Sequence, residues 1–174
     1  MVKKISLSVC AASVLLLAAC QSMEQGTGQK ASASLDSRSG SNTKGTVNFV
    51  WQGPDVLVTG NFSGLKPNAE QGFHVHEKGD CSAPDATSAG GHFNPDTKPH
   101  GMPGSGANHA GDMPNIKSDA NGNAIYSAKL SGFAVNTGPT GILGKSVVVH
   151  RDPDDYKSQP AGNSGPRIAC GLIK

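Results

Sequence analysis

Six histidines are the residues of this chain whose types and spacing most clearly allow chemistry. His74 and His76 are two residues apart in an apolar run, and residues at that spacing in a β-strand point to the same face. Two imidazoles side by side can bind a transition metal. An isolated pair of this kind is, however, more often an exposed polar face. The pair alone therefore leaves a metal site and a solvated strand open.

A long segment rich in glycine, proline and histidine follows this pair, from Gly79 to about Pro114. It carries four further candidate ligands, which are His92, His100, His109 and Asp112. Three imidazoles and a carboxylate can close a tetrahedral zinc site, and a bound metal would hold so polar a segment in place. His150 ends the apolar run 146–149 and could be either a ligand or a strand-end residue. Taken alone, the segment is equally compatible with a solvated loop.

The elements that must position these side chains are predicted to be β-strands, because no long stretch repeats at helical spacing. Alternation and β-branched residues predict about eight short strands, at 31–36, 46–51, 55–62, 71–77, 115–119, 123–130, 146–151 and 167–173. Asn121-Gly122 predicts a hairpin between the fifth and sixth of them. The segments 79–114 and 152–166 are predicted to be long functional loops. This pattern predicts an all-β antiparallel sandwich or flattened barrel.

The first 19 residues are predicted to be a secretory signal that does not belong to the fold. Lys3 and Lys4 precede an apolar run that is too short for a confident membrane span. The signal ends in Leu17-Ala18-Ala19-Cys20, which resembles the lipobox of bacterial lipoproteins, although an ordinary signal with a chance cysteine is the alternative. The resemblance implies a lipid on Cys20. The stretch that follows is polar and lacks aromatic residues, which predicts a flexible tether over 20–30 and a folded domain over 31–174. In lipoproteins, Gln21 after the cysteine favours the outer membrane, facing the bacterial periplasm.

The charge of the mature chain is expected to be balanced. The full chain has 15 basic and 13 acidic residues, and the signal removes two lysines and no acidic residue, which leaves 13 of each. There is accordingly no global basic field that would predict binding to nucleic acid or to an acidic membrane. We expect contact with a membrane only through the N-terminal lipid.

Two cysteines remain after the signal and the lipid site are set aside. They are Cys81 and Cys170, and in an exported chain they most simply form a disulfide. A pair of metal-binding or reactive thiols is the alternative, although neither cysteine belongs to a Cys-x-x-Cys pair.

Taken together, the motifs closely resemble the copper/zinc superoxide dismutases. They are Gly72-Phe73-His74-Val75-His76-Glu77, Gly90-Gly91-His92-Phe93-Asn94-Pro95, His100-Gly101, His109-Ala110-Gly111-Asp112, Val147-Val148-Val149-His150 and Gly165-Pro166-Arg167-Ile168-Ala169-Cys170-Gly171. The resemblance covers about residues 31–174 and implies an eight-stranded Greek-key fold. It implies copper bound by His74, His76, His92 and His150, and zinc bound by His92, His100, His109 and Asp112. His92 would then be shared by the two metals.

The same resemblance implies roles for four further residues. Asp154 would tie His74 to His100, Arg167 would stand at the mouth of the copper site, and Cys81 and Cys170 would be the family disulfide. The implied activity converts superoxide into oxygen and hydrogen peroxide, and a homodimer is one expected assembly. The loop 152–166 is shorter than in eukaryotic members and lacks their steering charge pair, so Arg167 would carry most of the attraction. A metal buffer and a structural zinc lipoprotein are the rival functions, but the latter would need neither Arg167 nor His150.

Overall fold

The computed structural model describes residues 28–174, so the predicted signal segment, Cys20 and the tether up to residue 27 lie outside the described residues. Nine strand segments and one short 3-10 helix occur among the described residues. They are β1 (Lys30–Ser37), β2 (Lys44–Gln52), β3 (Asp55–Ser63), β4 (Glu70–Gln71), β5 (Phe73–His76), η1 (Thr87–Ala89), β6 (Ile116–Lys117), β7 (Ala124–Leu130), β8 (Ser146–His150) and β9 (Arg167–Leu172). None of the described helices could cross a membrane.

Strand β1 shows how the sequence pattern creates a two-sided sheet. Ala31, Ala33 and Leu35 are buried, whereas the residues between them are exposed. Successive side chains of a strand point to opposite faces, so this alternation turns one apolar face inward. The strand begins at Lys30, and the backbone of Gly28 and Gln29 already pairs with Trp51. The sheet therefore includes the last residues of the predicted tether.

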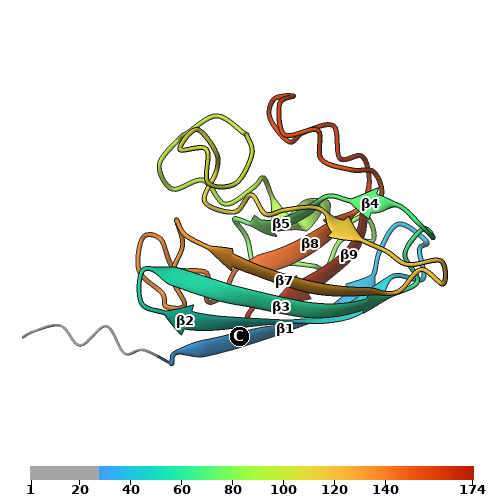
Figure 1. Cartoon of the computed structure of the whole chain (residues 1–174), viewed down its shortest axis with the longest axis horizontal. Coiled ribbons are helices and arrows are strands. Elements are labelled where there is room, and N and C mark those ends of the chain that lie inside the picture. The colour runs from blue at the N-terminus through green and yellow to red at the C-terminus, as the bar shows by residue number, and fades with distance from the viewer. Residues whose placement is uncertain (1–27) are drawn as a thin grey trace, which may run out of the picture.

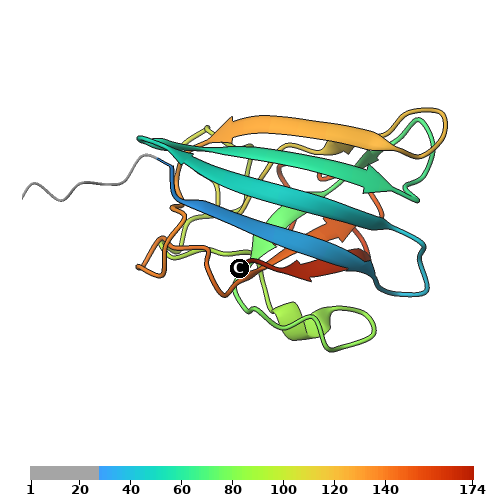
Figure 2. The same cartoon turned by 90° about the horizontal axis from the view of Figure 1, so that it is seen from below.

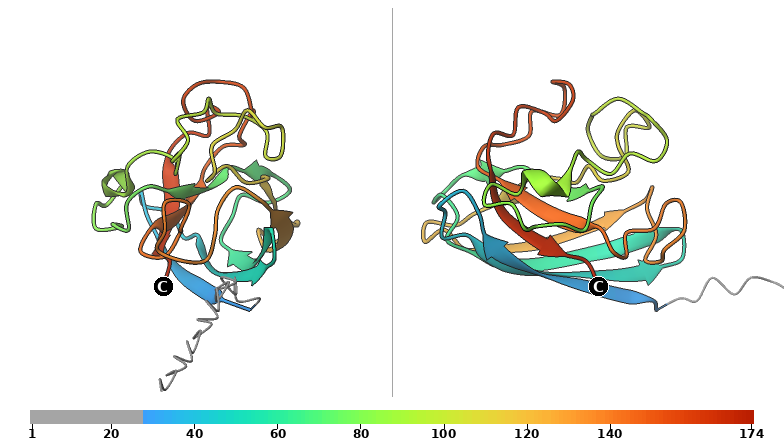
Figure 3. Two further views of the ribbon diagram at one scale, coloured as in Figure 1. Left: turned by 90° about the vertical axis from the view of Figure 1, so that its left-hand side faces the viewer. Right: turned by 180° about the vertical axis from the view of Figure 1, so that it is seen from behind.

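Seven strands form one antiparallel sheet in the order β5-β8-β9-β1-β2-β3-β7 (Figure 2). Strand β1 joins its two halves, because residues 30–35 pair with β2 while Asp36 and Ser37 pair with β9. The sheet curls over on itself when viewed from its end (Figure 3). The predicted all-β flattened barrel with two long loops is thereby confirmed.

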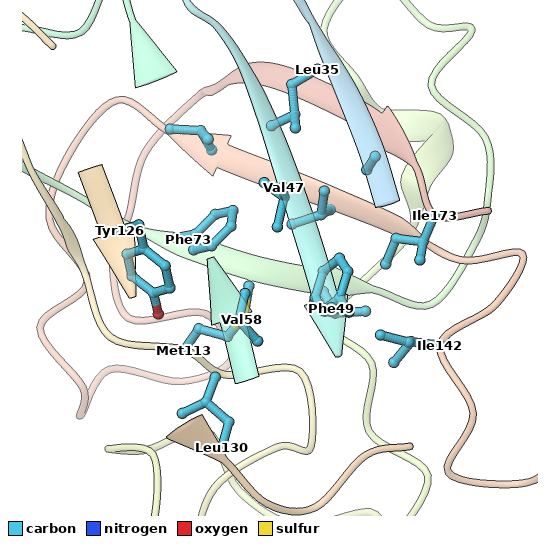
Figure 4. Close-up of a cluster of buried hydrophobic side chains, with 14 of the residues drawn as sticks. Leu35, Val47, Phe49, Val58, Phe73, Met113, Tyr126, Leu130, Ile142 and Ile173 are labelled. Atoms are coloured by element: carbon cyan, nitrogen blue, oxygen red, sulfur yellow. The ribbon is translucent and has the colours of Figure 1, made fainter. Parts of the chain in front are cut away.

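The core fills the space enclosed by this curl (Figure 4). Phe73 from β5 packs edge-on against Phe62 and Tyr126, with ring centroids 5.4 and 5.1 Å away. Phe49 and Val47 of β2 are fully buried beside them. Each side chain of this size contributes about 1.5–3 kcal/mol when it leaves water. Phe73 precedes His74, so the packing of one fixes the backbone that presents the other.

The strand predicted over 71–77 is divided in two, and the division lies at Gly72. Its N–H donates to the carbonyl of Asp152 at 2.9 Å, and its carbonyl accepts from the N–H of His150 at 2.8 Å. These bonds turn the chain from β4 into β5, so that only β5 joins the main sheet. The division accounts for nine strand segments where about eight were predicted.

The hairpin predicted around Asn121-Gly122 is a turn without a two-stranded ladder. The Asp119 side chain accepts from the N–H groups of Asn121 and Asn123, and Gly122 has a positive φ of 73°. However, β6 pairs with β4 and β7 pairs with β3. The prediction of paired neighbours is wrong because each strand finds its partner elsewhere in the barrel.

Both long loops lie on the side of the sheet opposite β1, β2 and β3 (Figure 1). The first connects β5 to β6 and the second connects β8 to β9. The first loop contains η1 as the only regular element among its residues, all of which are described. Strand ends and loops therefore meet on one face, where all the predicted ligands are found.

Candidate metal centre

Strand β5 presents His74 and His76 toward the first long loop. Phe73 and Val75 point into the core, so the two histidines between and after them point the other way. Both histidines are nevertheless fully buried, because the loop covers this edge of the sheet. The Val75 N–H donates to the Gly111 carbonyl at 2.9 Å, and the approach is so close that a Cβ on Gly111 would collide with the Val75 carbonyl.

Four buried histidines form the first cluster, which comprises His74, His76, His92 and His150. One ring nitrogen of each lies within 4.8 Å of one ring nitrogen of every other. The Nε2 atoms of His76 and His150 are 3.3 Å apart, whereas their Nδ1 atoms lie 3.0 and 3.1 Å from the carbonyls of Gly90 and Gly165. The backbone thus holds the outer nitrogens and leaves the inner ones facing each other.

Three histidines and one carboxylate form the second cluster, which comprises His92, His100, His109 and Asp112. Asp112 Oδ1 lies 2.8 Å from His92 Nδ1, 3.1 Å from His100 Nδ1 and 3.3 Å from His109 Nδ1. Its Oδ2 accepts from the N–H groups of His109 and Gly101. All four side chains are buried, and His92 belongs to both clusters.

Asp154 links the two clusters through one histidine of each. Its Oδ2 lies 2.8 Å from His74 Nε2, and its Oδ1 lies 2.9 Å from His100 Nε2. A carboxylate can only accept, so both Nε2 atoms carry a proton, and the neutral ring of His74 keeps a free lone pair on Nδ1. Gly162 allows this approach, because a Cβ there would collide with Asp154.

The electrostatics of the two clusters differ. Burial lowers the pKa of all four histidines of the first cluster, and that of His150 to about 4. Burial would also lower the pKa of His100, but the carboxylates of Asp112 and Asp154 raise it to about 9. Burial would raise the pKa of Asp112, but the surrounding histidines hold it far below its usual range. The first cluster is a set of neutral imidazoles, and the second contains a carboxylate.

The residues fit metal ions because three buried ring nitrogens lack a hydrogen-bond partner among the described residues. They are His74 Nδ1, His92 Nε2 and His100 Nδ1. Leaving such a group unpaired costs about 1–3 kcal/mol, and a cation in each cluster would remove that cost. Imidazole suits copper and zinc, and a carboxylate with three imidazoles suits tetrahedral zinc.

Arg167, the first residue of β9, lies beside the first cluster. Its Nη1 donates to the Ala86 carbonyl at 2.7 Å, and its Nη2 donates to the Gly90 carbonyl at 2.6 Å. The Gly90 carbonyl is also the one that His76 Nδ1 contacts. Burial is the largest cause of the lowered pKa values of His76 and His150, and the positive charge of Arg167 lowers them further. Arg167 also lines a surface hollow of about 270 Å³.

A disulfide joins Cys81 to Cys170, as predicted. The Cα atoms are 5.7 Å apart, and the bridge spans 89 positions of the sequence. It attaches the start of the first loop to β9, three residues after Arg167. Cys20, the predicted lipid site, lies outside the described residues.

Comparison with known proteins decides the family. The profile described as copper/zinc superoxide dismutase (SODC) matches residues 43–173. The chain belongs to the copper/zinc superoxide dismutase family. It is 43% identical to "Superoxide dismutase [Cu-Zn] 2" of Aquifex aeolicus, over 99% of both chains. It is accordingly a superoxide dismutase of the copper/zinc type, with copper and zinc as its cofactors.

Two solved structures have a similar fold. The crystal structure of the clock protein EA4 matches with a TM-score of 0.75 and 39% identity, covering 85% of this chain and 95% of that one. A variant of a SOD-like protein from Bacillus subtilis matches with a TM-score of 0.70 and 35% identity, covering 80% and 94%.

Two residues that support the superoxide dismutase site were not predicted from the sequence. The side-chain amide of Gln159 bonds to the backbone of His100, and that of Asn115 bonds to the backbone of Asp154. Both pairs bridge the two long loops, across 59 and 39 positions. No local pattern marks an amide whose partner lies so far along the chain.

Proposed function

We propose that the protein dismutes superoxide in the bacterial cell envelope, with copper in the first cluster and zinc in the second. The observation that carries this assignment is the sharing of His92 between two buried four-residue clusters. Four imidazoles without a carboxylate suit a copper ion that changes valence, and three imidazoles with Asp112 suit zinc.

The two nitrogens of His92 support a bridging role. Its Nδ1 lies 2.8 Å from Asp112 and 3.4 Å from His109 Nδ1, so this nitrogen belongs to the second cluster. Its Nε2 is buried without a hydrogen-bond partner among the described residues, which leaves it for the first cluster. The ring stacks on His74 with centroids 3.9 Å apart.

This arrangement can supply one of the protons that the reaction needs. Two superoxide ions and two protons give oxygen and hydrogen peroxide, and bound copper supplies the one-electron changes that zinc cannot supply. His92 can hold a proton at Nε2 between the two half-reactions and donate it to the departing peroxide. His109 and Asp112 surround Nδ1, so the ring keeps its orientation while Nε2 gains and loses the proton.

Replacing one residue of each cluster tests the metal assignment. We expect His150→Ala to lose copper and activity while it keeps zinc, because His150 belongs to the first cluster alone. Asp112→Ala should release zinc first and loosen the long loop. Copper and zinc per chain, measured on the same samples as superoxide consumption, give the result.

Asp96→Ala is the matched control, because Asp96 is an exposed aspartate of the same loop whose carboxylate contacts Lys98. It should retain both metals. The assignment fails if His150→Ala retains full activity without copper, or if Asp112→Ala loses copper and retains zinc.

We also propose that a lipid on Cys20 attaches the protein to the outer membrane, facing the periplasm. Support comes from the sequence Leu17-Ala18-Ala19-Cys20 and from Gly28, whose backbone bonds to Trp51 only eight residues after Cys20. Cys20→Ser should release the protein into the soluble periplasmic fraction or block its processing, as fractionation without detergent would show. Cys10→Ser, a change within the signal, should not alter the location. A wholly soluble unaltered protein would contradict the anchor.

A further inference from the structure

His100 has an unusual backbone environment for a residue at the centre of a site. It belongs to no strand, and it makes no backbone-to-backbone hydrogen bond with any described residue. Its N–H donates to Gln159 Oε1 at 2.8 Å, and its carbonyl accepts from Gln159 Nε2 at 2.9 Å. One side-chain amide thus satisfies both backbone groups of His100.

The segment that carries Gln159 is itself held in shape. The carboxylate of Asp155 accepts from the N–H groups of Lys157 and Ser158, from the Ser158 hydroxyl and from the Asn163 amide. Gln159 Nε2 also donates to the Lys157 carbonyl at 3.2 Å. Gln159 is exposed, yet it lies in a hydrogen-bonded turn, and its own amide is held by the Lys157 carbonyl.

A second amide bridges the loops in the opposite direction. Asn115, just after the first loop, donates from Nδ2 to the Asp154 carbonyl and accepts at Oδ1 from the Asp154 N–H, both at 3.0 Å. Asp154 in turn accepts from His100 Nε2. Gln159 therefore fixes the backbone of His100. The carboxylate of Asp154 fixes its ring, and Asn115 holds the backbone of Asp154 in place.

We propose that Gln159 is a positioning residue for the second cluster. By fixing the backbone of His100, it keeps the ring between Asp112 and Asp154, so that a residue outside the cluster determines how firmly zinc is held. The loop 152–166 thereby affects zinc binding, although none of its residues belongs to the second cluster. This inference rests on the proposed assignment of zinc to the second cluster.

Zinc release from the metal-loaded protein tests the proposal. Gln159→Ala removes both hydrogen bonds to His100 along with the bond to the Lys157 carbonyl, and the loss of neutral bonds of this kind predicts roughly a three- to tenfold faster release of zinc to a chromogenic chelator. Gln159→Glu keeps the acceptor for the His100 N–H but sets an oxygen against the His100 carbonyl, so its release rate should also rise. Gln52→Ala is the matched control, because Gln52 is an exposed glutamine whose side chain makes no hydrogen bond to a described residue. Its release rate should not change.

Hydrogen exchange of the His100 amide in the metal-free protein provides a second measurement that does not depend on metal binding. Its protection should fall roughly three- to tenfold in Gln159→Ala and stay unchanged in Gln52→Ala. Equal zinc release and equal amide protection in Gln159→Ala and the unaltered protein would overturn the proposal. Lowered protection in a protein that never bound zinc would instead refute the metal assignment and leave the contact between Gln159 and His100 intact.

Discussion

Each histidine of the first cluster is prepared for a metal by the hydrogen bond on its other nitrogen. His76 and His150 contact backbone carbonyls through Nδ1, which leaves the lone pair on Nε2. His74 contacts Asp154 through Nε2, which leaves the lone pair on Nδ1. The tautomer of each ring is thus fixed by a neighbour that lies at least 14 positions away in the sequence. Residue type alone could not show which nitrogen each ring would offer.

Arg167 combines a charge with a structural contact, and two substitutions separate these contributions. Superoxide offers little surface for recognition, so its attraction must depend on charge. Arg167→Ala should slow superoxide removal roughly tenfold or more, and should flatten the decline in rate with rising salt. Arg167→Lys keeps the charge but cannot donate to both the Ala86 and Gly90 carbonyls as the guanidinium does. It should therefore retain the salt dependence and lose part of the rate.

Stopped-flow decay of superoxide at several ionic strengths measures both effects. Arg151→Ala is the matched control, because Arg151 is exposed and its guanidinium is paired with Asp152 at 2.9 Å. Its rate and salt slope should stay close to those of the unaltered protein. If Arg167→Ala matched the unaltered protein in both quantities, the steering role would have to be abandoned.

At the scale of elements, the first long loop is held by three attachments to two strands, β5 and β9. Gly111 bonds to Val75 of β5, Cys81 is linked to Cys170 of β9, and Arg167 of β9 binds Gly90. A loop with so little regular structure would otherwise lose much conformational entropy on ordering. The attachments lie on both sides of His92, so the shared histidine is held from both directions along the chain.

The sequence predicted the strands well because their pattern is local. Alternation in β1, β2 and β3 depends only on neighbouring residues, and the observed bounds differ from the predicted ones by at most two residues. Strand partners are less local: an Asn-Gly turn connects β6 to β7, but β6 pairs with β4 and β7 pairs with β3. The barrel as a whole decides that pairing, so a turn signal could not predict it.

The candidate site shows the same division between local and distant information. His74 and His76 were paired by strand spacing, and the remaining members of both clusters were expected from the family resemblance. The structure gathers them into two groups that share His92. Gln159 and Asn115 could not be predicted, because their hydrogen bonds are the product of two loops meeting in the folded protein.

At the scale of the whole molecule, the barrel separates a rigid face from a functional face. Strands β1, β2 and β3 form one side, and the two loops lie on the other (Figure 1). The sheet carries the core, so changes in the loops can alter metal binding without removing the main source of stability. The buried histidines are an exception, because their protonation couples the site to the stability of the whole domain.

We expect the metal-free, disulfide-bonded domain to be most stable near pH 6.5, the ordinary pKa of histidine. Burial lowers the pKa of His150 to about 4, so between pH 6.5 and 4 the unfolded chain binds more protons and stability falls as the pH falls. Each such histidine contributes up to about 1.4 kcal/mol per pH unit.

Burial would lower the pKa of His100 too, but Asp112 and Asp154 raise it to about 9. The folded state therefore holds the extra proton between pH 6.5 and 9, and stability falls as the pH rises. Urea unfolding with a chelator at pH 5, 6.5 and 8.5 measures this curve, and His150→Gln should flatten its acid side. Stability that rose continuously from pH 5 to 8.5 would show that His100 is not held in its charged form.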